Sequence, residues 1–248
     1  MQQRTTASHW DRAFLHDSPK LHAYLQDHPH ERGEVRFLQS IAEEGMTAVD
    51  IGSHVGIAAV TIAKSVGPTG TLHCFEPTQA YFDALNRNVA LNDLQNVHTH
   101  CIAVTDRAGE CVVHKDGAAT SIVPRPTDER FTVHTITLDC FSLQEKMTQI
   151  DLLNVDCEGS ELLALHGAAG ILRRGAPQIF VEIHHDTLPY FNHDVGDVVA
   201  YLQDLDFVVR AVRLDKLGFT ADFKTCEYVY AFKEDWRGNS VPTTSDRA

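Results

Sequence analysis

The sequence predicts an α/β fold in which a mostly parallel sheet is covered by helices on both faces. Apolar segments of strand length alternate along the chain with segments of helix length. Strands joined by helical crossovers form parallel sheets that are buried on both faces. The chain has 248 residues, of which 43% are hydrophobic and 22% charged, so it can bury one sizeable core.

The first half of the sheet is expected to consist of strand–helix units. Phe37, Leu38 and Ile41 stand at helical spacing and predict a helix over residues 34–41. Pro77 suits the first turn of a later helix. The predicted strands are residues 47–52, 71–76 and 96–103, and the helices between them are residues 55–66 and 77–92.

The second half begins with a looser pattern and then returns to alternation. Residues 116–128 are predicted to form a long surface loop, and long loops in compact domains often carry function. The predicted strands are residues 110–114, 133–138, 151–156 and 178–183, followed by a closing antiparallel pair at 207–212 and 227–232; the helices are residues 160–174 and 195–205.

Composition excludes several classes of partner. The net charge is −13, which argues against a nucleic-acid backbone or an anionic membrane surface as the main partner. No apolar stretch approaches the ~20 residues of a membrane span, and the N-terminus lacks the order of a signal peptide. The six cysteines show no C-x-x-C spacing, so we expect a reduced, cytoplasmic protein.

The first motif is Asp50-Ile51-Gly52-Ser53-His54-Val55-Gly56, between a strand and a helix. Glycines at this position let backbone N–H groups approach a ligand at the helix N-terminus. A dinucleotide fingerprint needs a glycine where His54 stands, which argues against a nicotinamide-dependent oxidoreductase. The loop suits the carboxylate and ammonium of an amino acid better, with Asp50 near the ammonium. The alternative is an ordinary tight turn.

The second motif is Glu76, at the end of the next strand. Its two carboxylate oxygens can accept hydrogen bonds from both hydroxyls of a ribose. The alternative is a charge at the N-terminus of the helix that begins at Pro77. Together with the loop at 50–56, the ligand interpretation is favoured.

Two further motifs place polar groups directly after buried strands. They are Asp156-Cys157-Glu158-Gly159-Ser160-Glu161 and Glu182-Ile183-His184. The carboxyl ends of parallel strands meet at one edge of a sheet, where ligands bind. The sequence therefore predicts one site at this edge. Glu161 is interpreted as a favourable charge in a helix's first turn, and the N-terminal histidines, His28 and His30 among them, as surface residues.

With these motifs in this order over residues 46–232, the sequence resembles the FkbM family of S-adenosylmethionine (SAM)-dependent methyltransferases. The resemblance implies a Rossmann-like class I SAM methyltransferase fold with a seven-stranded, mostly parallel sheet and an antiparallel C-terminal strand. We expect a helical extension or lid at 1–44, the methyltransferase domain at 45–233 and a polar tail at 234–248. The residues implied for SAM binding are Asp50, Gly52, Ser53, Gly56, Glu76, Ile102 and Ala103.

The family resemblance implies O-methylation of a small-molecule hydroxyl on a sugar, polyketide or similar natural product. That hydroxyl must lose a proton, to a base or with the help of a divalent metal. The candidates are Asp156, Glu158, Glu182 and His184; the hypothesis makes Asp156 or His184 the base and Glu182 the group that orients it. Alternatively, Asp156, Glu182 and His184 bind Mg²⁺ or Mn²⁺. A SAM-fold module that binds without turnover is the other alternative, and nucleic acid is disfavoured as acceptor by the net charge.

Overall fold

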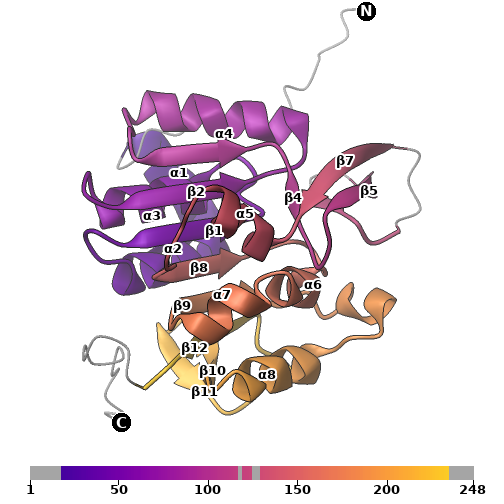
Figure 1. The fold of residues 1–248 in the computed structure, drawn as a ribbon. Coiled ribbons are helices and arrows are strands. Elements are labelled where there is room, and N and C mark those ends of the chain that lie inside the picture. The colour runs from indigo at the N-terminus through magenta and orange to yellow at the C-terminus, as the bar shows by residue number, and fades with distance from the viewer. Residues whose placement is uncertain (1–17, 117–118, 125–128, 235–248) are drawn as a thin grey trace, which may run out of the picture.

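The main sheet of the protein has eight strands in the order β11-β10-β12-β9-β8-β1-β2-β3 (Figure 1). It is seen in a computed structural model that describes residues 18–116, 119–124 and 129–234. Its strands are β1 (Thr47–Ile51), β2 (Thr71–Phe75), β3 (Val97–His100), β8 (Leu152–Val155), β9 (Gln178–Glu182), β10 (Val208–Arg213), β11 (Gly218–Thr220) and β12 (Tyr228–Phe232).

The strand directions confirm the predicted α/β fold with a mostly parallel sheet. Strand β1 is parallel to β2 and β8, β2 is parallel to β3, and β8 is parallel to β9. Strand β12 lies between β9 and β10 and is antiparallel to both, as expected for the C-terminal strand. The short strand β11 pairs with β10 and adds an eighth strand to the seven that were expected.

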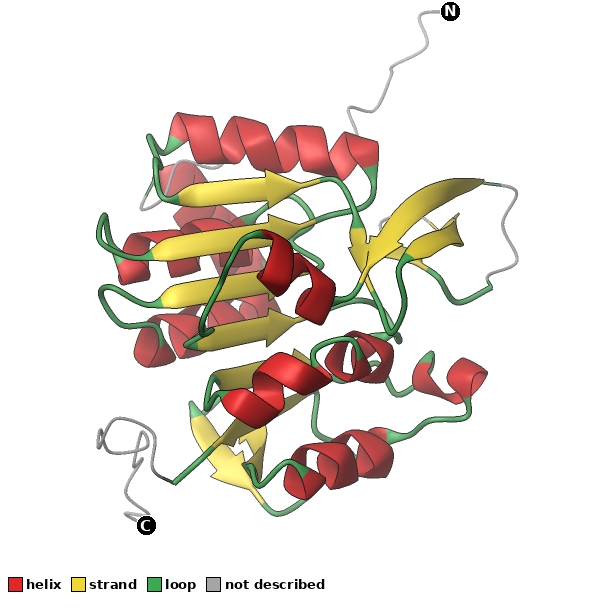
Figure 2. Ribbon diagram, in the orientation of Figure 1, coloured by secondary structure: helices red, strands yellow, loops and turns green. Residues whose placement is uncertain are grey.

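Helices cover both faces of the sheet (Figure 2). On one face, α5 (Leu138–Gln144), α6 (Glu161–His166), α7 (Ala169–Arg174) and α8 (Val195–Asp204) close one apolar core. On the other face, α2 (Pro29–Ile41), α3 (Ile57–Val66) and α4 (Gln79–Leu91) close a second core, which includes Phe37, Ile62 and Leu85. Apolar side chains on both faces of the same strands explain why those strands read as continuous apolar runs.

A second sheet of order β4-β7-β5-β6 lies beside the carboxyl ends of the parallel strands (Figure 1). Its strands are β4 (Ala103–Val104), β5 (Gly109–Asp116), β6 (Ala119–Ser121) and β7 (Arg130–Ile136). It corrects two expectations. The predicted strand 96–103 is divided, because β3 pairs with β2 whereas β4 pairs with β7. The predicted loop 116–128 contains strand β6, which pairs with β5; residues 117–118 and 125–128 lie outside the described residues.

The predicted helix 160–174 is also divided, into α6 and α7. The division falls at Gly167, where the chain touches the carbonyl oxygen of Thr105 so closely that a Cβ atom would come within 2.0 Å of it. Thr105 comes from the segment after β4, so this contact depends on the second sheet. Helix α5 was not predicted; Thr137 caps it by accepting a hydrogen bond from the Cys140 N–H (3.0 Å).

The N-terminal region contains α1 (Pro19–Asp27) and α2. Helix α2 packs against the sheet through Phe37, whose ring stacks on Phe180 of β9 at a centroid distance of 4.7 Å. The first 17 residues of the expected extension and residues 235–248 of the expected tail lie outside the described residues. In the part of the chain that the structure describes, no helix combines the length and the apolar character that a membrane span requires.

Candidate active site

A cavity of about 400 Å³ lies at the carboxyl ends of the parallel strands. This volume is in the range of small-molecule sites. Its walls come from the ends of β1, β2, β8 and β9, from α1 and α2, and from the second sheet. All the residues predicted from the sequence as site residues line this cavity except Asp50.

The loop after β1 follows a path that only glycine permits. Gly52 has φ +87°, and a Cβ atom there would lie 1.6 Å from the carbonyl oxygen of Asp156. Gly56 has φ +93°, and its Cβ would lie 2.6 Å from a methyl group of Leu85. Both positions combine a left-handed backbone with a close approach, which other residues adopt only with strain. The glycines thus bring the loop against β8 and begin α3 at the edge of the cavity.

Asp50 lies behind the cavity wall and is 1% exposed. Its Oδ1 accepts a hydrogen bond from Asn154 Nδ2 at 2.7 Å, whereas its buried Oδ2 has no hydrogen-bond partner. Burial raises the pKa of Asp50. Asn154 itself lines the cavity, so Asp50 contacts a residue of the cavity wall without lining the cavity itself.

Glu76 is a buried carboxylate held by backbone N–H groups. Oε2 accepts from His54 N–H at 3.0 Å, and Oε1 accepts from Thr78 N–H at 2.7 Å. Burial, which these hydrogen bonds only partly offset, raises the pKa of Glu76 to about 7. The carboxylate therefore joins the loop after β1 to the loop after β2 at the cavity wall.

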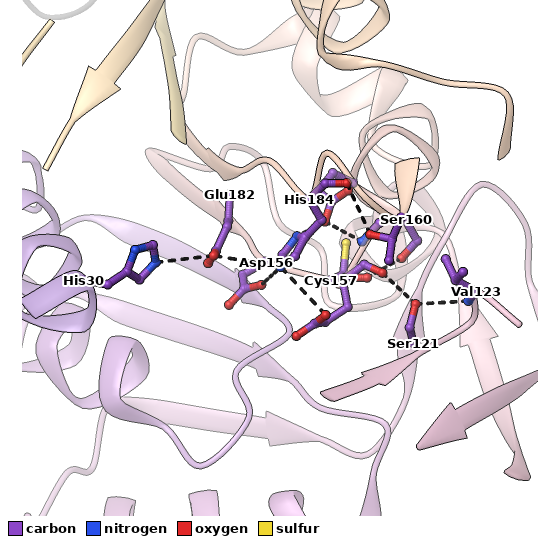
Figure 3. A network of polar contacts seen from close by, with 12 residues as sticks. His30, Ser121, Val123, Asp156, Cys157, Ser160, Glu182 and His184 are labelled. Atoms are coloured by element: carbon purple, nitrogen blue, oxygen red, sulfur yellow. Dashed lines mark hydrogen bonds and ion pairs between the residues drawn. The ribbon is translucent and has the colours of Figure 1, made fainter. Parts of the chain in front are cut away.

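The predicted catalytic residues gather around His184, which follows β9 (Figure 3). Its Nε2 lies 3.8 Å from Asp156 Oδ1. The same nitrogen lies 3.9 Å from Glu158 Oε2 and 3.9 Å from Glu182 Oε1. Three carboxylates from the ends of β8 and β9 thus face one imidazole nitrogen.

Glu161 corrects an expectation. It lies in the first turn of α6 but is completely buried rather than solvated. Its Oε1 lies 2.7 Å from His184 Nδ1 and also accepts from the Gly159 N–H at 2.8 Å. The chain reaches α6 through two residues with positive φ, Glu158 and Gly159. Glu161 fixes the imidazole of His184 so that Nε2 faces the cavity.

Burial and neighbouring charges together shift the pKa values of this group. Burial opposes the charge of His184, but the Glu161 hydrogen bond and the nearby Asp156 carboxylate raise its pKa to about 10. For Asp156, burial and the charge of Glu182 raise the pKa well above its usual range. For Glu182, burial works against the hydrogen bond with His30 and the charge of His184, which together lower the pKa.

Comparison with known proteins identifies the family. The Methyltransferase FkbM domain matches residues 50–209 of the chain.

This chain belongs to the FkbM methyltransferase family.

Similar solved structures are found at low sequence identity. An FkbM methyltransferase from Methylobacillus flagellatus is 16% identical with a TM-score of 0.52; the match covers 76% of this chain and 44% of that one. A SAM-dependent O-methyltransferase from Thermotoga maritima is 15% identical (TM-score 0.49, 81% and 64% covered), and an rRNA methylase from Streptococcus thermophilus is 11% identical (TM-score 0.44, 81% and 93% covered). The chain thus spans less than half of the M. flagellatus protein. No curated protein matches the sequence.

The cavity of this FkbM methyltransferase suits the SAM on which the family depends. SAM carries a sulfonium and an ammonium, and the side chains lining the described cavity include six carboxylates but neither lysine nor arginine. The carboxylates are Glu31, Glu34, Glu76, Asp156, Glu158 and Glu182. The glycine loop and the buried Glu76 line this acidic cavity together with the carboxylate–histidine group, and the unpartnered Oδ2 of Asp50 lies behind its wall.

Sequence reasoning missed the contribution of α2 to the site of this FkbM methyltransferase. His30 was expected at the surface, but its Nε2 lies 2.7 Å from the Tyr228 hydroxyl and 3.4 Å from Glu182 Oε1. The hydrogen bond with Glu182 outweighs partial burial and raises the pKa of His30 to about 9. Nothing local in the sequence around residue 30 indicates a partner on β9, because the contact depends on how α2 packs on the sheet.

Proposed function

We propose that the chain is a SAM-dependent O-methyltransferase that acts on a hydroxyl group of a small molecule. The proposal rests on one observation: a single cavity joins the glycine loop and Glu76 to the carboxylates around His184. Gly52, Ser53 and Gly56 provide backbone for the methionine part of SAM, Glu76 binds the ribose, and Ile102 and Ala103 contact the adenine. When bound, SAM supplies an electrophilic methyl group.

In this proposal Asp156 is the base that accepts the proton of the acceptor hydroxyl. His184 is the weaker candidate, because Glu161 occupies Nδ1 and the surrounding carboxylates hold the ring as a cation. As a cation, His184 donates from Nε2 toward the acceptor side of the cavity and keeps Asp156 oriented. Glu182, at the end of β9, orients His184, and Glu158 is the third carboxylate that faces the same nitrogen. A positioned base contributes roughly 10²–10⁴-fold to a rate.

The charge of the cavity supports a small acceptor rather than a nucleic acid. Binding a phosphate backbone requires lysine or arginine, which the described lining lacks. A sugar, polyol, polyketide or phenol hydroxyl fits an acidic wall without that requirement.

All six cysteines are free thiols rather than disulfides, which supports a reducing, cytoplasmic compartment.

Glu76→Gln is expected to weaken binding of S-adenosylhomocysteine by about tenfold or more, because a hydrogen bond to a charged group contributes about 1.5–3 kcal/mol. Calorimetric titration of the wild type and the variant measures this. The exposed Glu44→Gln variant is the matched control and should bind as the wild type does. Turnover is then measured with labelled SAM and an acceptor panel of free sugars, polyols and phenols. Equal affinity of Glu76→Gln and wild type would contradict the ribose assignment, and a folded wild type that binds without turnover would favour a non-catalytic module.

A divalent metal is the second candidate for activating the hydroxyl, and a specific observation favours it. Asp156, Glu182 and His184 each offer a ligand atom, and these atoms lie within 4.8 Å of one another. Histidine ligands of metals usually donate their other N–H to a carboxylate, which is what Glu161 provides. Mg²⁺ or Mn²⁺ would suit two carboxylates and an imidazole and would lower the pKa of a bound hydroxyl.

Under the metal alternative, Mn²⁺ added to EDTA-treated protein is expected to bind one site, which titration calorimetry or electron paramagnetic resonance detects. Affinity should fall about 10–100-fold in Glu161→Gln, which loses the group that orients His184. Glu145→Gln, at an exposed position away from the cavity, is the control. Full turnover after complete removal of divalent metal would exclude the alternative.

A further inference from the structure

Helix α2 reaches the centre of the site from outside the region that matches the family. His30 lies in its first turn, and Tyr228 lies on β12, whereas the family match covers residues 50–209. The two side chains nevertheless meet at Glu182, which points between His30 and His184 (Figure 3). The family signature therefore leaves unexplained how one carboxylate of the site is held.

The contacts form a continuous network from His30 through Tyr228 to Glu182. Tyr228 donates its hydroxyl hydrogen to Glu182 Oε2 at 2.9 Å, and the same hydroxyl lies 2.7 Å from His30 Nε2. His30 Nε2 is also 3.4 Å from Glu182 Oε1, and its Nδ1 is 3.4 Å from Glu227 Oε2. Both oxygens of Glu182 thus have a partner on the side away from His184.

The network is supported by packed rings and a hydrogen bond between α2 and β9. Tyr228 is 1% exposed, and its ring stacks on Phe180 at a centroid distance of 4.7 Å. Phe37, about two helical turns after His30 in α2, also stacks on the Phe180 ring, at a centroid distance of 4.7 Å. Gln178 Nε2 donates to the carbonyl oxygen of Ile41 at 2.8 Å and fixes the end of α2 to the start of β9. These contacts pack α2 against β9, and His30 Nε2 lies 3.4 Å from Glu182 Oε1.

Glu182 differs in this respect from the other carboxylates that face His184. Asp156 and Glu158 follow β8 in a turn with positive φ at Glu158 and Gly159, whereas Glu182 is the last residue of a central strand and is held by α2 and β12. The distance of 3.9 Å from Glu182 Oε1 to His184 Nε2 is therefore set by the network. A misplacement of about 1 Å at a catalytic centre can cost about 100-fold in rate.

We infer that His30 is a positioning residue of the reaction: together with Tyr228 it fixes Glu182, and through Glu182 it orients His184 toward the acceptor. Helix α2 is then part of the catalytic apparatus rather than only a cover of the sheet. The inference rests on the proposed function for its effect on turnover, whereas its effect on His184 is independent of turnover.

The test uses His30→Ala, His30→Gln and Tyr228→Phe, with the exposed His22→Ala as control. His30→Ala is expected to lower kcat on the acceptor panel about 10–100-fold while the affinity for S-adenosylhomocysteine changes by less than about twofold. Glutamine at position 30 can still donate to the Tyr228 hydroxyl and should recover part of the loss. His22→Ala should match the wild type.

A double-mutant cycle separates positioning from a general loss of structure. In a Glu182→Gln background, His30→Ala should cause almost no further loss of kcat, because two residues that act through one contact are not additive. A second full-size loss in that background would overturn the inference. Thermal unfolding of each variant checks that the fold is kept.

Nitrogen-15 NMR of labelled histidine provides the measurement that does not need an acceptor. The ring resonances of His184 should shift in His30→Ala and in Tyr228→Phe and stay in place in His22→Ala. Unchanged His184 resonances together with unchanged kcat would overturn the inference. Shifted resonances in a protein whose wild type shows no turnover would refute the proposed function and leave the positioning network standing.

Discussion

Asp156→Asn is expected to lower turnover on the acceptor panel by about 100-fold or more, the loss typical of removing a general base. Asparagine has the shape of aspartate but cannot accept the hydroxyl proton. The change also removes the carboxylate 3.8 Å from His184 Nε2. Steady-state kinetics with labelled SAM measures the loss, which should appear in kcat.

Binding of S-adenosylhomocysteine to Asp156→Asn should stay within about threefold of the wild type, because other residues make the contacts assigned to SAM and the substitution leaves the Asp156 backbone, on which Gly52 packs, unchanged. Asp186→Asn makes the same chemical change at an exposed position two residues after His184 and is the control. Wild-type kcat in Asp156→Asn would rule out Asp156 as base and leave His184 as the candidate.

Gly52→Ala is expected to destabilise the fold on the order of 3 kcal/mol, since it combines a disfavoured backbone with a steric overlap. The new Cβ atom would lie 1.6 Å from the Asp156 carbonyl oxygen and 2.7 Å from its carbonyl carbon. The loop after β1 must then move away from β8. Binding of S-adenosylhomocysteine should be lost even where the protein is still folded, because this loop holds the methionine part of SAM in the proposed function.

Gly109→Ala is the matched control for this prediction. Gly109 also has a positive φ, +143°, but a Cβ atom there would meet nothing within 4 Å. It should show only the backbone cost, about 1–2 kcal/mol. Urea unfolding and calorimetric titration of both variants separate the two effects. If both alanine variants lose the same stability and both bind the ligand, the close approach at Gly52 has no role in the site.

The sequence was sufficient to place the main strands and the side chains at their ends. Strand segments with apolar residues on both faces are typical of central strands, and parallel strands joined by helices end at the same edge. For this reason the sequence predicts Glu76, Asp156, Glu182 and His184 at one edge of the sheet, and in the structure they line one cavity. Their chemical roles remain proposals that the variants above test.

The second sheet could not be predicted from local sequence patterns. Strands β4 and β6 are short, and β4 belongs to a different sheet from β3 although only two residues separate them. Whether such a segment continues one strand or begins another depends on which partner offers hydrogen bonds, and β7 lies far along the chain. The helix break at Gly167 has the same origin, since it depends on the Thr105 carbonyl.

The amino-acid sequence by itself determined the α/β fold, the glycine loop and the acidic strand ends, because each follows from local periodicity or from a residue type that a local conformation requires. Only the tertiary structure decided that Glu161 is buried against His184 and that His30 holds Glu182. Both depend on the rotation of a helix about its axis. That rotation is set by apolar contacts between distant segments, such as Phe37 on Phe180, which no local pattern contains.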